Sequence, residues 1–251
     1  MDFGKGNYSD KRVVITGGGS GIGFAMAKLL VDGGARVVIT GRSRARLDGA
    51  RERLGENAVA IRGDVASLSD LDALADQVKS ELGAIEALFV NAGVAPLTPF
   101  ESTTEEAFDE LHAINVKGAY FTVQKLAPLL STGAGVVLTT SIANAIGMLE
   151  TSVYASSKAA LRSMARSLSR ELLPRGIRVN AVSPGPIDTG ILENTMTEEA
   201  AERFKAERVA DNPMRRFGTP EEVARAAAFL AFDATYTTGA ELVVDGGATQ
   251  L

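Results

Sequence analysis

The sequence is poor in the residues that most often perform catalysis. Its 251 residues include no cysteine, no tryptophan and a single histidine, His112. The lack of cysteine excludes disulfides, thiolate zinc sites and thiol nucleophiles. One histidine excludes a histidine-rich metal site, and a Ser-His-Asp triad would have to use His112 itself. Any chemistry must therefore come from serine, tyrosine, lysine, asparagine, a carboxylate or a cofactor.

The sequence also lacks a strong charge of either sign and any long apolar run. Lys and Arg total 26 and Asp and Glu total 31, so the formal net charge of −5 argues against binding nucleic acid through bulk charge. No apolar run reaches the length that spans a bilayer. The polar, glycine-rich residues 1–11 read as an N-terminal tail without the apolar core of a signal peptide. We expect a cytoplasmic protein with no nucleic-acid or membrane partner.

Short β-branched runs alternate with longer segments of helical periodicity. The expected strands are Arg12–Thr16, Arg36–Thr40, Ala58–Arg62, Ala87–Val90, Val136–Thr140, Arg178–Val182 and Glu241–Val244. This alternation predicts an α/β fold, a parallel sheet with helices on both faces. An open doubly wound sheet and a closed eight-stranded barrel both suit the length. Seven strands, with a glycine-rich segment after the first, favour the open Rossmann-type sheet. No linker interrupts the chain, so we predict one domain over residues 1–251.

Local patterns locate several of these elements. One helical face collects apolar residues at Leu71, Leu74, Ala75, Val78 and Leu82. Capping signals mark three helix starts, at Ser67 with Asp70, Thr103 with Glu106, and Thr219 with Pro220 and Glu222. The hexapeptide Arg12–Gly17 recurs as Arg36–Gly41. We interpret this recurrence as two neighbouring buried strands in similar surroundings, because nothing downstream repeats in step.

The glycine-rich segment after the first strand indicates a phosphate site. It reads Thr16-Gly17-Gly18-Gly19-Ser20-Gly21-Ile22-Gly23 and opens the first expected helix. Glycines let the backbone approach a pyrophosphate, and the helix N-terminus presents free N–H groups and the positive end of the helix dipole. The spacing Gly-x3-Gly-x-Gly differs from the general dinucleotide fingerprint. Its position at the first strand-to-helix junction still predicts dinucleotide binding.

The residues after the second strand bear on the choice of cofactor. An acidic residue there would bind the 2′-hydroxyl of NAD. This chain instead has Gly41-Arg42-Ser43. The Arg42 guanidinium can bind a 2′-phosphate in a bidentate manner, and the Ser43 hydroxyl can add a hydrogen bond. We therefore expect NADP(H), with NAD(H) as the alternative.

Tyr154 and Lys158 are candidates for acid–base chemistry without histidine. They lie four residues apart at the start of an alanine-rich helical stretch, and so share one helical face. A tyrosine titrates near pH 10 unless a positive charge lowers its pKa, so a neighbouring ammonium favours a general acid/base role. The strand ending at Thr140 places the Ser141 hydroxyl at the carboxyl edge of the sheet. A surface helix pair is the alternative interpretation of Tyr-x3-Lys.

Together these motifs resemble the short-chain dehydrogenase/reductase family over nearly the whole chain. The matching segments, in the family's order, are Thr16 to Gly23, Asp64-Val65, Asn91-Ala92-Gly93, Asn115, Ser141, Tyr154 with Lys158, Pro184-Gly185, and Val244-Asp245-Gly246-Gly247. One departure concerns Ser20, because many NADP-preferring members have a basic residue at that position. Arg42 would then provide most of the preference.

The resemblance implies a role for each matched residue. Tyr154 donates a proton to the substrate carbonyl oxygen in reduction and removes it in oxidation, while Ser141 hydrogen-bonds that oxygen. Lys158 lowers the Tyr154 pKa and binds the nicotinamide ribose, and Asn115 positions a water that relays protons. Cofactor contacts are expected from Gly17, Gly19, Ser20, Gly21, Ile22, Gly23, Arg42, Ser43, Asp64, Val65, Asn91, Ala92, Gly93, Tyr154, Lys158, Pro184, Gly185, Ile187 and Thr189. Among these, Asp64 and Val65 would contact adenine, and Ile187 and Thr189 the carboxamide.

The expected substrate site is less specified. Its candidate lining consists of Ser141, Asn144, Ile146, Met148, Leu149, Glu150, Tyr154, Ile191, Leu192 and Met196. Residues 186–213 have the composition of a substrate lid. The lining is mostly apolar, which favours a hydrophobic ketone or secondary alcohol, whereas Glu150 would suit a polyol.

Several functions are compatible with these residues. The leading one is an NADP(H)-dependent carbonyl reductase or alcohol dehydrogenase acting on a small molecule. Alternatives are a 3-oxoacyl-carrier-protein reductase, for which Arg215 and Arg216 would supply basic charge, a glucose-type sugar dehydrogenase, and a non-catalytic dinucleotide-binding regulator. The complete set of Asn115, Ser141, Tyr154 and Lys158 argues for turnover. The resemblance also implies a homo-oligomer, usually a homotetramer, formed through helices around Thr104–Leu130 and Val153–Leu173. We expect no metal, and a structural role for His112.

Overall fold

A seven-stranded parallel sheet forms the centre of the molecule. The computed structural model describes residues 8–190 and 197–251, and within them the strand order is β3-β2-β1-β4-β5-β6-β7. The strands are β1 (Arg12–Thr16), β2 (Arg36–Gly41), β3 (Ala58–Arg62), β4 (Ile85–Val90), β5 (Leu130–Thr139), β6 (Arg178–Pro184) and β7 (Glu241–Val244). The order reverses between β1 and β4, where an open α/β sheet places its ligand crevice. The predicted doubly wound sheet is confirmed and the barrel is excluded.

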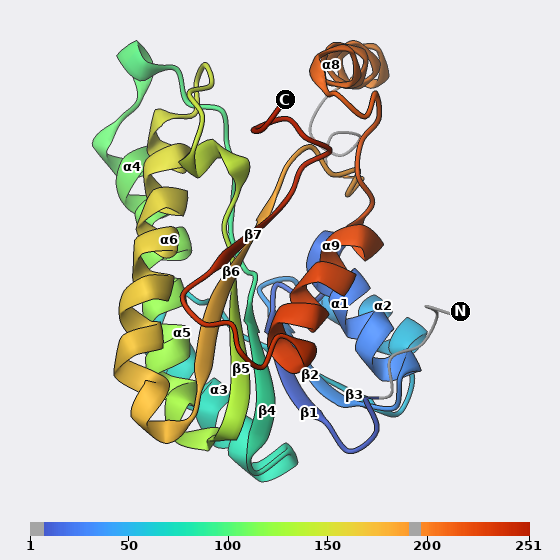
Figure 1. Cartoon of the computed structure of the whole chain (residues 1–251), viewed down its shortest axis with the longest axis vertical. Helices are drawn as coiled ribbons and strands as arrows, with labels where there is room; N and C mark the ends of the chain where they lie inside the picture. Colours follow the sequence, from blue (N-terminus) through green and yellow to red (C-terminus); the bar gives the residue numbers. More distant parts are fainter. Residues whose placement is uncertain (1–7, 191–196) are drawn as a thin grey trace.

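Helices cover both faces of the sheet (Figure 1). One face packs against α1 (Gly21–Asp32), α2 (Arg44–Leu54) and α9 (Pro220–Ala228). The other face packs against α3 (Leu68–Glu81), α5 (Ala119–Leu126) and α6 (Ser152–Leu172), with α4 (Glu105–His112) beside α6. Helix α8 (Glu198–Asp211) lies above the sheet in this view. No described helix combines the length and the apolar character needed to cross a bilayer.

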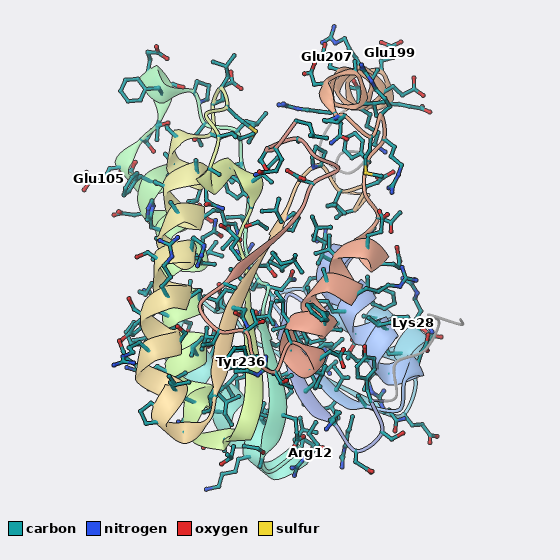
Figure 2. All side chains as sticks on the ribbon, viewed as in Figure 1. Arg12, Lys28, Glu105, Glu199, Glu207 and Tyr236 are labelled. Carbon is teal, nitrogen blue, oxygen red and sulfur yellow. The ribbon has the colours of Figure 1, made fainter. Side chains whose placement is uncertain are left out.

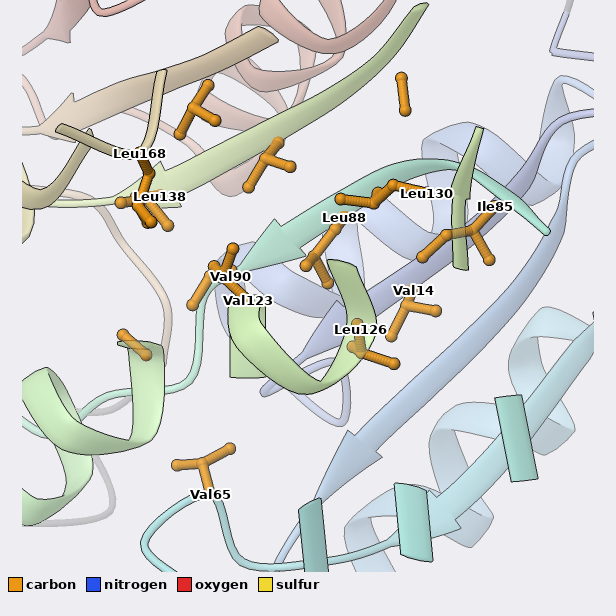
Figure 3. Packing of buried hydrophobic residues seen from close by; sticks show 14 of the residues in the cluster. Val14, Val65, Ile85, Leu88, Val90, Val123, Leu126, Leu130, Leu138 and Leu168 are labelled. Atoms are coloured by element: carbon orange, nitrogen blue, oxygen red, sulfur yellow. The ribbon is translucent and has the colours of Figure 1, made fainter. Parts of the chain in front are cut away.

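The core consists of two apolar clusters, one on each face of the sheet. Figure 3 shows part of the first, in which Val14 of β1 and Leu88 of β4 lie near Leu126 of α5. All three side chains are at most 1% exposed. The strands are apolar on both faces because helices cover both faces. This packing holds the strands in place, and with them the carboxyl edge of the sheet, where the candidate site lies.

The repeated hexapeptide has a direct structural explanation. Strands β1 and β2 pair in parallel with Arg12 opposite Arg36 and Thr16 opposite Thr40, so identical residues face one another along the ladder. Both strands are central, and their middle residues are buried. The interpretation of two neighbouring strands in similar surroundings is confirmed.

Two strands begin earlier in the chain than the sequence predicts. Strand β4 starts at Ile85 rather than Ala87, and β5 starts at Leu130 rather than Val136 and ends at Thr139. The early part of β5 pairs Leu130 with Ile85 before the register shifts. Its polar residues and Gly133, whose φ is +84°, resemble a turn in sequence, although they belong to the strand.

Two of the three predicted helix caps form at the predicted residues, one completely and one in part. Thr219 forms a full capping box, because its side chain accepts from the Glu222 N–H and the Glu222 carboxylate accepts from the Thr219 N–H at 2.8 Å. Ser67 accepts from the Asp70 N–H, but the Asp70 carboxylate accepts instead from the Asp64 N–H at 2.8 Å. Only half of that predicted box therefore forms.

The third predicted cap is wrong by one residue. Thr104 is the N-cap of α4 and accepts from the Ala107 N–H at 3.2 Å. The Thr103 hydroxyl instead donates to the Pro99 carbonyl at 2.8 Å. Thr103 ends the short 3₁₀ turn Phe100–Ser102 that precedes α4 and is not available to cap the helix.

The helical stretch around Thr104–Leu130 changes its hydrogen-bonding pattern part-way along. A π-helical turn, Ala113–Gly118, separates α4 from α5 and contains Asn115 near its centre. Single π turns inside helices occur frequently at functional sites. Hydrophobic periodicity cannot distinguish such a turn from an α-helix, so the sequence does not predict it.

Candidate active site

The glycine-rich loop between β1 and α1 is shaped by two close approaches. Gly17 has a φ of +67°, which side chains with a β-carbon rarely adopt. A β-carbon at Gly23 would lie 2.2 Å from the Gly17 carbonyl oxygen, so only glycine allows α1 to pack against the loop. The Asn91 amide donates to the Thr16 carbonyl at 3.2 Å and to the Gly17 carbonyl at 3.4 Å. These contacts connect the loop to the end of β4.

The first turn of α1 is open to a phosphate group. Ser20 is the N-cap of α1, and among the described residues its side chain forms no capping hydrogen bond. The backbone N–H groups at a helix N-terminus have no partner within the helix. They and the helix dipole therefore suit an anion at this position.

A cavity of about 390 Å³ extends from this loop along the carboxyl edge of the sheet. Of the predicted cofactor contacts, it is lined by Gly17, Gly19, Ser20, Arg42, Ser43, Asp64, Val65, Ala92 and Gly93. The cavity is also lined by residues that the sequence did not predict as cofactor contacts, namely Gly41, Arg46, Leu47, Gly63, Val94 and Ile114. The lining thus includes both the phosphate-binding turn and the basic loop after β2, which are features that suit a dinucleotide.

Further predicted cofactor contacts lie in the segment that follows β6. Gly21 approaches Thr189, whose β-carbon would be 3.3 Å from a β-carbon added at Gly21. Ile187 pairs with Gly218 in an isolated parallel bridge. Gly185 follows the end of β6 and packs against Asp245. The structure thus brings the segment after β6 close to the phosphate loop.

Basic side chains gather at the end of the cavity near β2. Arg42 and Arg46 line it, and the Arg62 Nε donates to the Arg42 carbonyl at 3.2 Å. Arg44 forms an ion pair with Asp48, at 3.2 Å. In the described part of the chain, neither Arg42 nor Arg46 forms an ion pair with a carboxylate. Their positive charge is therefore available to an anionic ligand.

Ser141, Tyr154 and Lys158 meet at the carboxyl end of β5. Ser141 follows this strand and is 9% exposed, while Lys158 is 5% exposed. The Lys158 Nζ donates to the Thr139 carbonyl at 2.9 Å and lies 5.7 Å from the centroid of the Tyr154 ring. The Ser141 hydroxyl interacts with the Tyr154 phenol. The predicted proximity of the three side chains is observed.

The electrostatics of this group differ from the prediction. Burial raises the pKa of the Tyr154 phenol above its usual value, and the Ser141 hydroxyl acts in the opposite direction. In the protein alone, burial therefore affects this pKa more than the neighbouring ammonium of Lys158, which donates to the Thr139 carbonyl. Burial also lowers the pKa of Lys158 to about 8. The site therefore contains a neutral phenol beside a readily deprotonated ammonium.

Asn115 connects the π-helical turn to this group. Its Nδ2 donates to the Val94 carbonyl at 2.9 Å and to the Ser157 hydroxyl at 3.1 Å, and its Oδ1 accepts from the Val94 N–H at 2.9 Å. A β-carbon at Gly93 would lie 3.1 Å from Asn115 Oδ1 and 3.4 Å from Lys158 Nζ. Both polar groups thus border the space that Gly93 leaves open.

The predicted substrate residues are placed differently from one another. The Asn144 amide donates to the Ser141 carbonyl at 2.5 Å and to the Glu241 carboxylate at 2.8 Å. Leu149 is 92% exposed, and Glu150 is exposed with a φ of +59°. The Met148 carbonyl accepts from the Thr151 hydroxyl at 2.9 Å. Ile191, Leu192 and Met196 lie outside the described residues.

Comparison with known proteins agrees with this geometry. A family model described as enoyl-(acyl carrier protein) reductase matches residues 17–249. The chain belongs to the short-chain dehydrogenase/reductase family. It is 42% identical over 244 residues to the oxidoreductase asL5 of Sarocladium schorii, covering 96% of each chain. It is 36% identical over 244 residues to the L-fucose dehydrogenase of Mus musculus, covering 96% of this chain and 89% of that one.

A solved structure of the family has the same fold. The short-chain dehydrogenase/reductase from Brucella melitensis, named as a glucose/ribitol dehydrogenase, superimposes with a TM-score of 0.92 at 31% identity. The match covers 99% of this chain and 100% of that chain. The family resemblance is therefore confirmed. As a member of this family, the protein is an NAD(P)-dependent oxidoreductase that acts on CH–OH or C=O groups of small molecules.

Proposed function

We propose that this short-chain dehydrogenase/reductase transfers a hydride between NADP(H) and a ketone or secondary alcohol, with Tyr154 as general acid/base. The observation that supports this most is the grouping of Tyr154, Ser141 and Lys158 beside the cavity that Arg42 and Arg46 line. A β-carbon at Gly93, which lines this cavity, would lie 3.4 Å from Lys158 Nζ. The nicotinamide supplies the hydride when bound, and the protein supplies position and a proton.

The protein's own groups account for the proton transfer. In reduction the Tyr154 phenol donates its proton to the substrate oxygen, which the Ser141 hydroxyl orients by a hydrogen bond. Lys158, with a pKa of about 8, favours the phenolate that remains and returns a proton to it. Asn115 borders the opening beside Lys158, and we assign it the positioning of a relay water there.

The preference for NADP(H) rests on uncompensated positive charge. Arg42 and Arg46 line the cavity, with Arg62 donating to the Arg42 carbonyl. A 2′-phosphate would offset this charge and accept several hydrogen bonds, whereas a 2′-hydroxyl would not. The Ser43 Oγ accepts from the Arg46 N–H at 3.3 Å, which leaves its hydroxyl proton to donate to a phosphate.

We expect Arg42→Ala to weaken NADPH binding about 30-fold, by about 2 kcal/mol, and to leave NADH binding nearly unchanged. Fluorescence titration of both cofactors measures this. Arg44→Ala is the matched control, because Arg44 is an exposed neighbour already paired with Asp48. Equal dissociation constants for NADPH and NADH in the unaltered protein would contradict the proposal.

For the substrate, we propose a hydrophobic ketone or secondary alcohol, with the described residues 186–190 and 197–213 contributing to a lid within the single domain. A sugar is the second candidate, supported by the exposed Glu150 four residues before Tyr154 and by the dehydrogenase names of the proteins from Mus musculus and Brucella melitensis. A carrier-protein substrate is less favoured, because Arg216 forms an ion pair with Glu222 at 2.6 Å.

A substrate panel with both cofactors separates these functions. Ketones, aldoses and a 3-oxoacyl thioester would be assayed with NADPH and NADH, and the alcohols with the oxidised cofactors. We expect the fastest NADPH oxidation with apolar ketones. Faster turnover of aldoses, lost in Glu150→Gln, would favour the sugar dehydrogenase. No turnover of any substrate would contradict the proposed reaction.

We also propose that the protein is a homotetramer. Support comes from an apolar hollow of about 570 Å³ on α4, the π turn, α5 and α6, lined by His112, Val116, Tyr120, Phe121 and Met164 among others. His112 stacks on Phe108 there, with 4.2 Å between ring centroids, which suits its expected structural role. Sedimentation velocity tests the proposal, and a monomer at micromolar concentration would contradict it.

A further inference from the structure

The Glu241 carboxylate joins three segments close to the proposed catalytic residues. Glu241 is the first residue of β7, the edge strand beside β6 (Figure 1). Its Oε1 accepts from Asn144 Nδ2 at 2.8 Å and from the Ser183 hydroxyl, and its Oε2 accepts from Arg162 Nε at 3.0 Å. The Arg162 and Glu241 side chains are 14% and 19% exposed, so this pair is largely shielded from water.

Two of these contacts connect Glu241 to the backbone around Ser141, one through Asn144 and the other through Ser183. The Asn144 amide that binds Glu241 also donates to the Ser141 carbonyl at 2.5 Å. The Thr140 hydroxyl, one residue before Ser141, contacts the Ser183 hydroxyl, which in turn donates to Glu241. The Ser141 backbone is therefore connected to the same carboxylate from both sides.

The third contact reaches the helix that contains Tyr154 and Lys158. Arg162 follows Lys158 by four residues and Tyr154 by eight, so the three side chains lie along one face of α6. Arg162 also donates from a guanidinium nitrogen to the Gly239 carbonyl at 3.0 Å. Arg162 thus attaches this face of α6 to the start of β7.

We propose that Glu241, with Arg162 and Asn144, forms a positioning cluster that sets the distance between the Ser141 and Tyr154 hydroxyls. The inference rests on the proposed function, in which both hydroxyls contact the substrate oxygen. Ser141 and Tyr154 come from separate segments, and Glu241 is bonded to both segments. Small displacements of groups that act together at one atom reduce the rate strongly, even when substrate still binds.

Glu241→Gln is the main test. Glutamine has the size of glutamate and can still accept from Asn144 and Ser183, but its amide N–H₂ then faces the N–H of Arg162. We expect kcat for NADPH oxidation, with the best ketone of the panel, to fall about ten-fold or more. The assay is run at a temperature well below the melting temperature of the variant. The KM of the ketone and the dissociation constant of NADPH should change less than about two-fold, because the loss concerns the transition state.

The chain offers a matched control at the other end of the sheet. Glu86 accepts from Arg12 at 2.6 Å and from the Ser131 hydroxyl at 3.3 Å, and its side chain is 22% exposed. Arg12 lies at the lower end of the molecule in Figure 2, far from α8. Glu86→Gln should lower the melting temperature as Glu241→Gln does, with kcat unchanged. An equal loss of kcat in both variants would overturn the proposal.

Other variants distinguish positioning from stability and from substrate binding. Asn144→Ala should also lower kcat at unchanged KM. This variant replaces Glu241→Gln as the main test if Glu241→Gln does not fold. Arg162→Met combined with Glu241→Gln should lose no more rate than the single variant, because both act through one contact. Unchanged kcat, or a raised KM alone, in Glu241→Gln and Asn144→Ala would overturn the proposal. If Tyr154→Phe keeps its activity, the proposed function itself fails instead.

Discussion

Tyr154→Phe is expected to lower kcat about 1,000-fold, within the range by which a positioned proton donor accelerates a reaction. The substitution removes only the hydroxyl and leaves the ring that packs beside Lys158. No other group with a labile proton in the described site has the same relation to Ser141, whose hydroxyl interacts with the phenol. The dissociation constant of NADPH should stay within about three-fold, because the phenol acts mainly in the transition state.

Steady-state kinetics with the best substrate of the panel, together with NADPH titration, measures both quantities. Tyr236→Phe is the control, since this tyrosine is fully exposed (Figure 2). Retention of more than about a tenth of the rate in Tyr154→Phe would assign the proton to another donor and end the proposed mechanism.

The sheet could be predicted from the sequence because the determining signal is local. Buried parallel strands are continuously apolar, and the two copies of the hexapeptide Arg12–Gly17 and Arg36–Gly41 are both such strands, which pair in register. The failures have a shared cause as well. The early part of β5 and the π turn at Asn115 depend on pairing and packing partners distant in sequence. Residue type and periodicity do not report those partners.

The candidate site also has features that the sequence predicts and features that it does not. The four-residue spacing of Tyr154 and Lys158 predicts their proximity, since it follows from helix geometry. Their protonation could not be predicted, because it depends on burial and on the Thr139 carbonyl, which only the fold provides. The same spacing, extended by one turn, points to Arg162. Nothing in the sequence indicates that Arg162 meets Glu241, which lies 79 residues further along the chain.

Lys158→Met should change the pH dependence of stability, because a buried ammonium destabilises the folded state. The pKa of Lys158 falls from 10.5 to about 8 on folding, owing to burial. Between these values the unfolded chain binds a proton that the folded chain does not, so the stability of the unaltered protein rises with pH across this window. Below pH 8 the cost of the buried charge is fully present, and it amounts to about 3 kcal/mol. Methionine has no charge to bury and removes this cost.

The variant should therefore be more stable than the unaltered protein at pH 7 and less stable above pH 10. Losing the hydrogen bond to the Thr139 carbonyl costs about 1 kcal/mol at every pH, so the net gain at pH 7 is about 2 kcal/mol and becomes a loss of about 1 kcal/mol at high pH. Urea unfolding of both proteins from pH 6 to 11 measures the difference. Lys28→Met, on the exposed side of α1, is the control because it removes no buried charge. A Lys158→Met difference that stays constant with pH would show that Lys158 is not desolvated in the folded protein.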